Sequence, residues 1–263
     1  MSSEFAAIRE EFDQELEAIR AVISAFSDPK ISSPKARVAA VNSATLLLAA
    51  TFEEFVREMA RAYARSVVNG SETFDKIPTK IVATAWRKSM EALSRLQIDA
   101  IDERSSRDVI FMGALARFNS ILEFCRGDRT QDIYKDLIHN ENNMRPVEIN
   151  GLFKMCELRN VCLAICDKLP LLEAFAETEP GKAHGQLLIS LNAFFERRNQ
   201  IAHTIAMMRS SGPDLIMKDI DLFSRFGMAL CETLEAKVPE PKDRTGNGQT
   251  TVEPYAETSE RQT

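Results

Sequence analysis

Apolar residues recur at intervals of three and four along almost the whole chain, and this helical period constrains the fold more than any other feature. In the first segment the recurring residues are Phe5, Ile8, Phe12, Leu16, Ile19, Ile23 and Phe26. We find no β-type alternation of useful length and no internal repeat. Apolar types make up 44% of the 263 residues, enough for a real core. The sequence therefore predicts an all-α, single bundle-like domain.

Capping residues, prolines and glycines mark where the helices should begin and end. A second helix should start with Ser33 as its cap and Pro34 in its first turn and run to Gly70, with a kink or break near "VNSAT" as an open alternative. Further helices are expected over 79–102, over "RDVIFMGALARFNSILEFCRG" up to Gly127, over 186–208 and over 215–236. The segment "EINGLFKMCELRNVCLAICDKL" is expected to form one or two shorter helices, broken at Pro170. Residues 127–147 are polar and are expected to form a loop.

Three segments follow from this pattern. Residues 1–33 hold an N-terminal amphipathic helix, and residues 34–237 hold the main helical domain. Residues 238–263 have almost no apolar side chains, which predicts a disordered tail.

The charge balance and the N-terminus bear on location and partners. The formal net charge is −6, so any contact with nucleic acid would need a local basic patch. The start, "MSSEFAAIREEFDQE", lacks the basic region and apolar core of a signal peptide. The longest apolar run, "ATLLLAATF", stops at Glu53 and is too short to span a bilayer. We expect a soluble, cytoplasmic protein with no membrane partner.

Five cysteines are present, an odd number with no C-x-x-C pair, so a disulfide framework is not expected. Cys162 and Cys166 lie one helical turn apart, which leaves two readings open. They are thiolate ligands of a zinc ion, or they are buried small apolar residues, and the second is favoured because paired knuckles and four ligands are missing. No metal and no cofactor is expected.

The stretch "FFERRNQIAHTIAMM" places Arg198, Asn199 and His203 within a turn and a half of a helix that is otherwise apolar. Asn199 and His203 share a face, because residues four apart lie one turn from each other. The pattern alone allows a solvated polar face, a hydrogen-bond cluster inside the bundle, or one wall of a catalytic cleft.

The segment "LLISLNAFFERRNQIAH" resembles the signature helix of the HEPN superfamily, in which an arginine and a polar residue precede a histidine. Arg198, Asn199 and His203 match that signature residue by residue. Arg197 gives an alternative spacing but lacks the polar residue directly after it. The segments "ATLLLAATFEEFVREMARAY", "KIPTKI" and "RPVEINGLFKMCEL" are similar to the RiboL-PSP type of this superfamily, so the resemblance covers most of residues 34–235.

The resemblance implies a metal-independent endoribonuclease that acts as a homodimer, with two signature helices meeting at a shared cleft. RNA carries its own nucleophile, the 2′-OH, so the protein has only to move protons and to stabilise charge on the phosphate. His203 is the expected general acid or base, and Arg198 is the expected phosphate clamp. Asn199 would orient the imidazole or bind a phosphate oxygen.

Glu53 occupies the position of the acidic residue that recurs in the early helix, where it would hold Arg198. A solvated carboxylate paired with Arg57 is the alternative. RNA is thus the expected partner, in a toxin or antiviral effector with an antitoxin or another defence-system partner. A non-catalytic HEPN module that binds nucleotide or RNA, or that serves only for dimerisation, is the alternative function.

Overall fold

The computed structural model describes residues 3–28, 30, 32–96, 104–139, 142–203 and 212–238. All regular elements in these ranges are helices, which confirms the all-α prediction. The α-helices are α1 (Glu4–Ser27), α2 (Pro34–Gly70), α3 (Thr79–Ser94), α4 (Arg104–Cys125), α5 (Tyr134–Leu137), α6 (Pro146–Lys154), α7 (Val161–Ala164), α8 (Leu169–Ala174), α9 (Pro180–His203) and α10 (Pro213–Glu235). Two 3-10 turns, η1 (Phe74–Lys76) and η2 (Ile165–Asp167), lie in the connections.

The longest helix, α2, organises the fold. Ser33 caps it as predicted, because its hydroxyl accepts a hydrogen bond from the Ala36 backbone N–H at 3.2 Å. The helix runs unbroken through "VNSAT", so the alternative of a break there is wrong. Among the described helices only α2 is long and apolar enough to cross a bilayer, but core helices pass the same test. Here its apolar residues from Val41 to Val68 are largely buried against other helices.

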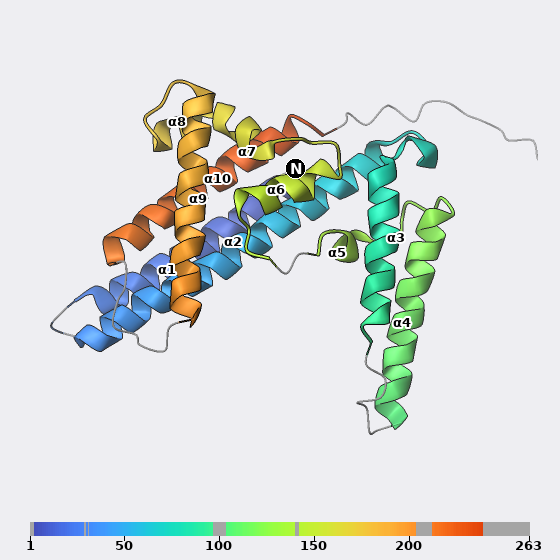
Figure 1. Ribbon diagram of the computed structural model, residues 1–263, viewed down its shortest axis with the longest axis horizontal. Helices are drawn as coiled ribbons and strands as arrows, with labels where there is room; N and C mark the ends of the chain where they lie inside the picture. The colour runs from blue at the N-terminus through green and yellow to red at the C-terminus, as the bar shows by residue number, and fades with distance from the viewer. Residues whose placement is uncertain are drawn as a thin grey trace, which may run out of the picture.

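α1 and α10 pack along α2, and α9 crosses it (Figure 1). The crossing is filled by aromatic rings centred on Phe52 of α2. The Phe52 ring stacks on Phe223 at a centroid distance of 4.2 Å and meets Phe226 edge-on at 5.1 Å. It also contacts Phe195 of α9 at 6.3 Å. Since α1 contributes buried residues to the same core, the first helix, α2 and α10 form one packed unit.

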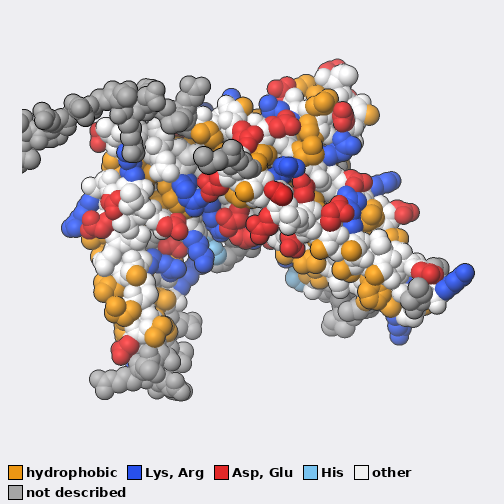
Figure 2. Space-filling view, turned by 180° about the vertical axis from the view of Figure 1, so that it is seen from behind, with side chains coloured by type: hydrophobic (Ala, Val, Ile, Leu, Met, Phe, Trp, Pro, Cys, Tyr) orange, Lys and Arg blue, Asp and Glu red, His pale blue; other side chains and the backbone are white. Residues whose placement is uncertain are grey.

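The α3–α4 hairpin projects from the end of α2 as an arm (Figure 1). It is joined to the body through α5, which packs against both α3 and α2. On α4 several large apolar side chains are exposed, and Figure 2 shows apolar side chains gathered on the arm. They include Val109, Phe111, Met112, Leu115 and Phe118.

Several element boundaries differ from the sequence-based expectation. The short helix α5 lies inside the stretch expected to be a loop, and it forms because Tyr134 and Leu137 are buried between α2 and α3. Pro170 stands in the first turn of α8 rather than at a helix end, and α9 begins at Pro180 rather than at residue 186. Proline is accepted in the first turn of a helix because the N–H that it lacks has no partner there.

The helix expected over 79–102 ends at Ser94, with Arg95 as its cap, so the expectation is wrong for residues 95 and 96. Val238, the first residue of the predicted tail, packs against the core. Residues 97–102, 204–208 and 239–263, on which the remaining expectations for these segments fall, lie outside the described residues.

Replacing Phe52 by alanine should lower the free energy of unfolding by about 3–5 kcal/mol, because the change leaves a cavity where three helices meet. Urea unfolding followed by circular dichroism measures the loss. The matched control is Val147→Ala, at a side chain that is 78% exposed, where we expect a change below about 0.5 kcal/mol. Equal effects at both positions would contradict the central place of Phe52.

Candidate active site

The crossing of α9 over α2 brings the signature residues next to the early helix. Phe195 is fully buried at this crossing, and Arg198 follows it by three residues, so both lie on the side of α9 that meets α2. Glu53 follows the buried Phe52 directly in α2. The two polar residues therefore approach each other because the two aromatic residues pack.

Arg197 is held in a structural contact. Its guanidinium donates to the Asp219 carboxylate of α10 at 2.6 Å and lies over the Phe194 ring, 5.8 Å from its centroid. Burial raises the pKa of Asp219, and the Arg197 guanidinium opposes that rise. Arg197 thus compensates a largely buried carboxylate and ties α9 to α10.

Arg198 is arranged differently, although it is the next residue. It is half-buried, and its Nη1 donates to Asn199 Oδ1 at 3.3 Å. Its Nε is buried and has no hydrogen-bond partner among the described residues. One donor of the guanidinium is therefore unsatisfied among the described residues.

Glu53 is half-buried beside Arg198. Burial raises the pKa of Glu53, while the charges of Arg57 and Arg198 and a hydrogen bond donated by the Met144 backbone N–H oppose the rise. Its Oε1 is buried without a hydrogen-bond partner among the described residues. Glu53 is therefore close enough to interact electrostatically with both arginines. These contacts do not decide between its two expected roles, as the partner of Arg198 or as a carboxylate paired with Arg57.

Asn199 is half-buried, and its Oδ1 accepts a hydrogen bond from Asn143 Nδ2 at 2.9 Å. His203 is the last residue of α9 and is exposed. It follows Arg198 by five residues, which is about 140° around a helix of 3.6 residues per turn. Within one chain, Arg198 and Asn199 thus lie together, whereas His203, the last described residue of α9, lies on another side of the helix from Arg198.

A loop before α6, with residues 143–145, also takes part in this cluster and was not recognised in the sequence as part of the site. Besides the contacts of Asn143 and Met144, Arg145 forms an ion pair with Glu196 of α9 at 3.3 Å. The only local signal was the run of polar residues before Pro146, which looks like any loop. Its contact with Asn199 spans 56 positions and follows from the packing of α6 under α9.

Three arginines recur every four residues on α2, at Arg57, Arg61 and Arg65, and this arginine line is neutralised by carboxylates. Arg57 and Arg61 pair with Glu54, Arg61 also pairs with Glu58, and Arg65 pairs with Glu4 of α1. This line therefore behaves as a solvated, charge-balanced face. It does not present a row of uncompensated cations to an RNA backbone.

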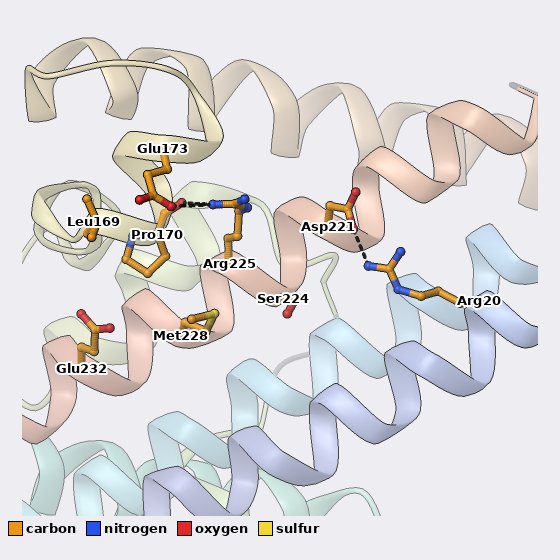
Figure 3. A pocket seen from close by; sticks show the side chains of 9 residues that line it. All are labelled: Arg20, Leu169, Pro170, Glu173, Asp221, Ser224, Arg225, Met228 and Glu232. Atoms are coloured by element: carbon orange, nitrogen blue, oxygen red, sulfur yellow. Dashed lines mark hydrogen bonds and ion pairs between the residues drawn. The ribbon is translucent and has the colours of Figure 1, made fainter.

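The pocket shown in Figure 3, of about 670 Å³, lies between α8, α10 and α1. Its main charged groups are already paired, Arg20 with Asp221 and Arg225 with Glu173. Opposite charges that satisfy each other leave no group poised for chemistry. This pocket is also built from residues other than the signature residues.

The cysteines do not form a site in the described part of the chain. Cys162 and Cys166 are fully buried, and burial raises the pKa of each thiol to about 12. A metal ligand or a nucleophile must be a thiolate, which such a pKa disfavours. Among the described residues, no group of three or more His, Cys, Asp or Glu side chains could hold a metal ion.

Replacing Glu53 by glutamine should stabilise the protein at pH 7 relative to wild type and change little at pH 4. A raised pKa in the folded state means that stability is highest below the unfolded value of 4.5 and is lost as the pH rises through the folded value. Glutamine keeps an acceptor for Met144 but cannot ionise. Urea unfolding of both proteins at pH 7 and pH 4 gives the difference in free energy of unfolding between variant and wild type at each pH. If this difference favours the variant less at pH 7 than at pH 4, the raised pKa is contradicted.

Comparison with curated proteins and with solved structures gives no match. Comparison with protein families gives one match, to RiboL-PSP-HEPN, over residues 10–238. The matched range contains all the residues of the cluster described above and most of α1, which the sequence resemblance had left out. The chain belongs to the RiboL-PSP-HEPN family, and membership of this family indicates a ribonuclease-like or RNA-binding function.

Proposed function

We propose that this protein is a metal-independent endoribonuclease whose reaction is carried by Arg198, Asn199 and His203, with Glu53 supporting Arg198. The observation that carries the proposal is the contrast between two adjacent arginines. Arg197 is engaged with Asp219, whereas Arg198 keeps a buried Nε without a described partner beside Asn199. A guanidinium next to the Asn199 side-chain amide suits the oxygens of a phosphodiester.

The reaction begins with the 2′-OH of the substrate, which attacks the adjacent phosphorus while a histidine accepts its proton. Arg198 stabilises the negative charge that gathers on the non-bridging oxygens. The bond from phosphorus to the 5′-oxygen then breaks, and that oxygen takes a proton from a general acid. The products are a 2′,3′-cyclic phosphate and a 5′-hydroxyl, and no metal or cofactor takes part in these steps.

One chain offers one signature histidine, but the reaction needs a base and an acid. We propose that a symmetric homodimer supplies the pair by bringing two α9 helices together. The exposed position of His203 on α9 supports this arrangement. So does the angle of about 140° that separates it from Arg198 on its own helix.

His203→Ala and Arg198→Ala should each lower cleavage of a mixed RNA pool by at least about a thousandfold, because each removes a group that acts in the transition state. Cleavage by wild type should survive EDTA and should stop on a substrate with a 2′-deoxy sugar at the scissile position. Gel analysis of end-labelled RNA and mass spectrometry of the fragment ends measure both effects.

The matched controls are His184→Ala, in the first half of α9, and Arg197→Ala. The first should retain activity, and the second should reduce stability through loss of the Asp219 contact. If His203→Ala cleaves RNA as fast as wild type, the catalytic assignment of His203 is refuted. A wild type that binds RNA but does not cleave it would favour the non-catalytic HEPN module instead.

Mixing the inactive His203→Ala protein into wild type should reveal a shared site. If both histidines of a dimer are needed, an equal mixture that has exchanged subunits should retain about a quarter of the activity, because only wild-type dimers work. Independent protomers would retain about half. Light scattering on the same samples should show dimers, and full activity in a monomer would rule out the composite cleft.

We further propose that the protein acts in the cytoplasm as a toxin or antiviral effector that an antitoxin or another defence-system partner restrains. Support comes from Arg198, which Asn199 satisfies only in part and whose guanidinium suits a phosphate. Growth inhibition on expression of wild type, relieved in His203→Ala, would support this role. Equal growth in both cases would count against it.

A further inference from the structure

The last part of the α5–α6 loop, residues 142–145, touches the site just before α6 begins. Asn143 Nδ2 donates to Asn199 Oδ1 at 2.9 Å. The backbone N–H of the next residue, Met144, lies close enough to the Glu53 carboxyl to oppose the rise of its pKa. Two successive residues of one loop thus contact the signature helix and the early helix, which come from distant parts of the sequence.

This loop segment is firmly placed. The Met144 side chain is fully buried, so it anchors the loop in the core. The Arg145 backbone N–H donates to the Asn143 carbonyl oxygen at 2.7 Å, which closes a tight turn around Met144. Pro146 follows as the first residue of α6 and is itself buried. Asn143 is therefore fixed by the buried Met144 that follows it and by the turn that its own carbonyl closes with Arg145. Its side-chain amide thus meets Asn199 in a defined geometry.

The contact decides which way the Asn199 amide faces. An asparagine side chain has an oxygen that only accepts hydrogen bonds and a nitrogen that only donates them. Asn143 Nδ2 and Arg198 Nη1 both donate to Asn199 Oδ1, at 2.9 Å and 3.3 Å. The reversed orientation would set the Asn199 nitrogen against two donors. The oxygen is thus committed inside the protein, and the NH₂ group faces outward from the pair as a donor.

We propose that Asn143 is a positioning residue for RNA cleavage. By holding Asn199 Oδ1, it presents the Asn199 NH₂ group to a non-bridging oxygen of the scissile phosphate. Arg198 supplies the neighbouring donors. Asn143 itself does not touch the substrate, and the inference rests on the ribonuclease activity proposed above.

The test compares variants of the full-length protein on one RNA substrate. Asn143→Ala should lower kcat by about tenfold with KM nearly unchanged. The variant loses the hydrogen bond that positions Asn199, and the Asn199 NH₂ group helps only once charge builds on the phosphate. Asn143→Asp has the same shape without the donor and should lose activity as well, whereas Asn143→Gln keeps the amide and should recover most of kcat. The control is Asn119→Ala, which truncates an exposed amide on the α4 arm and should match wild type.

A double-mutant cycle separates positioning from a general effect on the fold. In an Asn199→Ala background, Asn143→Ala should cause no further loss of kcat, because Asn143 acts only through Asn199. Losses that multiply would overturn the proposal. An unchanged kcat in Asn143→Ala would also overturn the positioning role, and the proposed ribonuclease function would be unaffected by that result.

Two further outcomes are informative. If the wild type does not cleave RNA at all, the proposed function fails, and the role of Asn143 fails with it. If thermal unfolding shows that Asn143→Ala does not fold, the pair Asn143→Asp and Asn143→Gln decides. Equal kcat in these two would overturn the role of the amide donor, and a loss confined to Asn143→Asp would support it.

Discussion

The packing of Phe52 against the aromatic rings of α9 and α10 is the contact on which the site depends. It fixes where α9 crosses α2, and the residues next to it in sequence are then carried to their places. Glu53 follows Phe52 directly, and Arg198 follows Phe195 by one helical turn. A carboxylate and a guanidinium from helices far apart in the chain thus become neighbours, because two aromatic side chains are excluded from water.

The pair Arg197 and Arg198 shows how one helix can serve stability and chemistry with the same residue type. Successive residues point about 100° apart on a helix, so the two guanidinium groups meet different surroundings. Arg197 meets the buried Asp219, and removing either partner would leave an unpaired charge. Arg198 meets an amide oxygen and a partly buried carboxylate that it does not fully satisfy. The environment, rather than the residue type, separates the two roles.

The sequence predicted the fold class, the cap at Ser33 and the course of the long helices, because local periodicity and capping chemistry determine these features. It did not predict α5 or the start of α9. Burial of Tyr134 and Leu137 forms α5 in a polar stretch, and α9 begins at Pro180, six residues before the expected start at residue 186. The signature residues Arg198 and Asn199 were visible because they lie in one helix. Asn143 was not, because its contact with Asn199 exists only after α6 has packed under α9.

The site has a rigid part and an open part, and the difference bears on how a reaction would be completed. Glu53, Arg198 and Asn199 are half-buried and tied to α2 and to the α5–α6 loop, so their geometry is set by the folded chain. His203 is exposed at the end of α9. A group that transfers protons must lie within hydrogen-bond reach of the atom that it serves. An exposed imidazole gains a fixed place when a second surface packs against it. A second copy of the same helix would provide that surface and the second imidazole together.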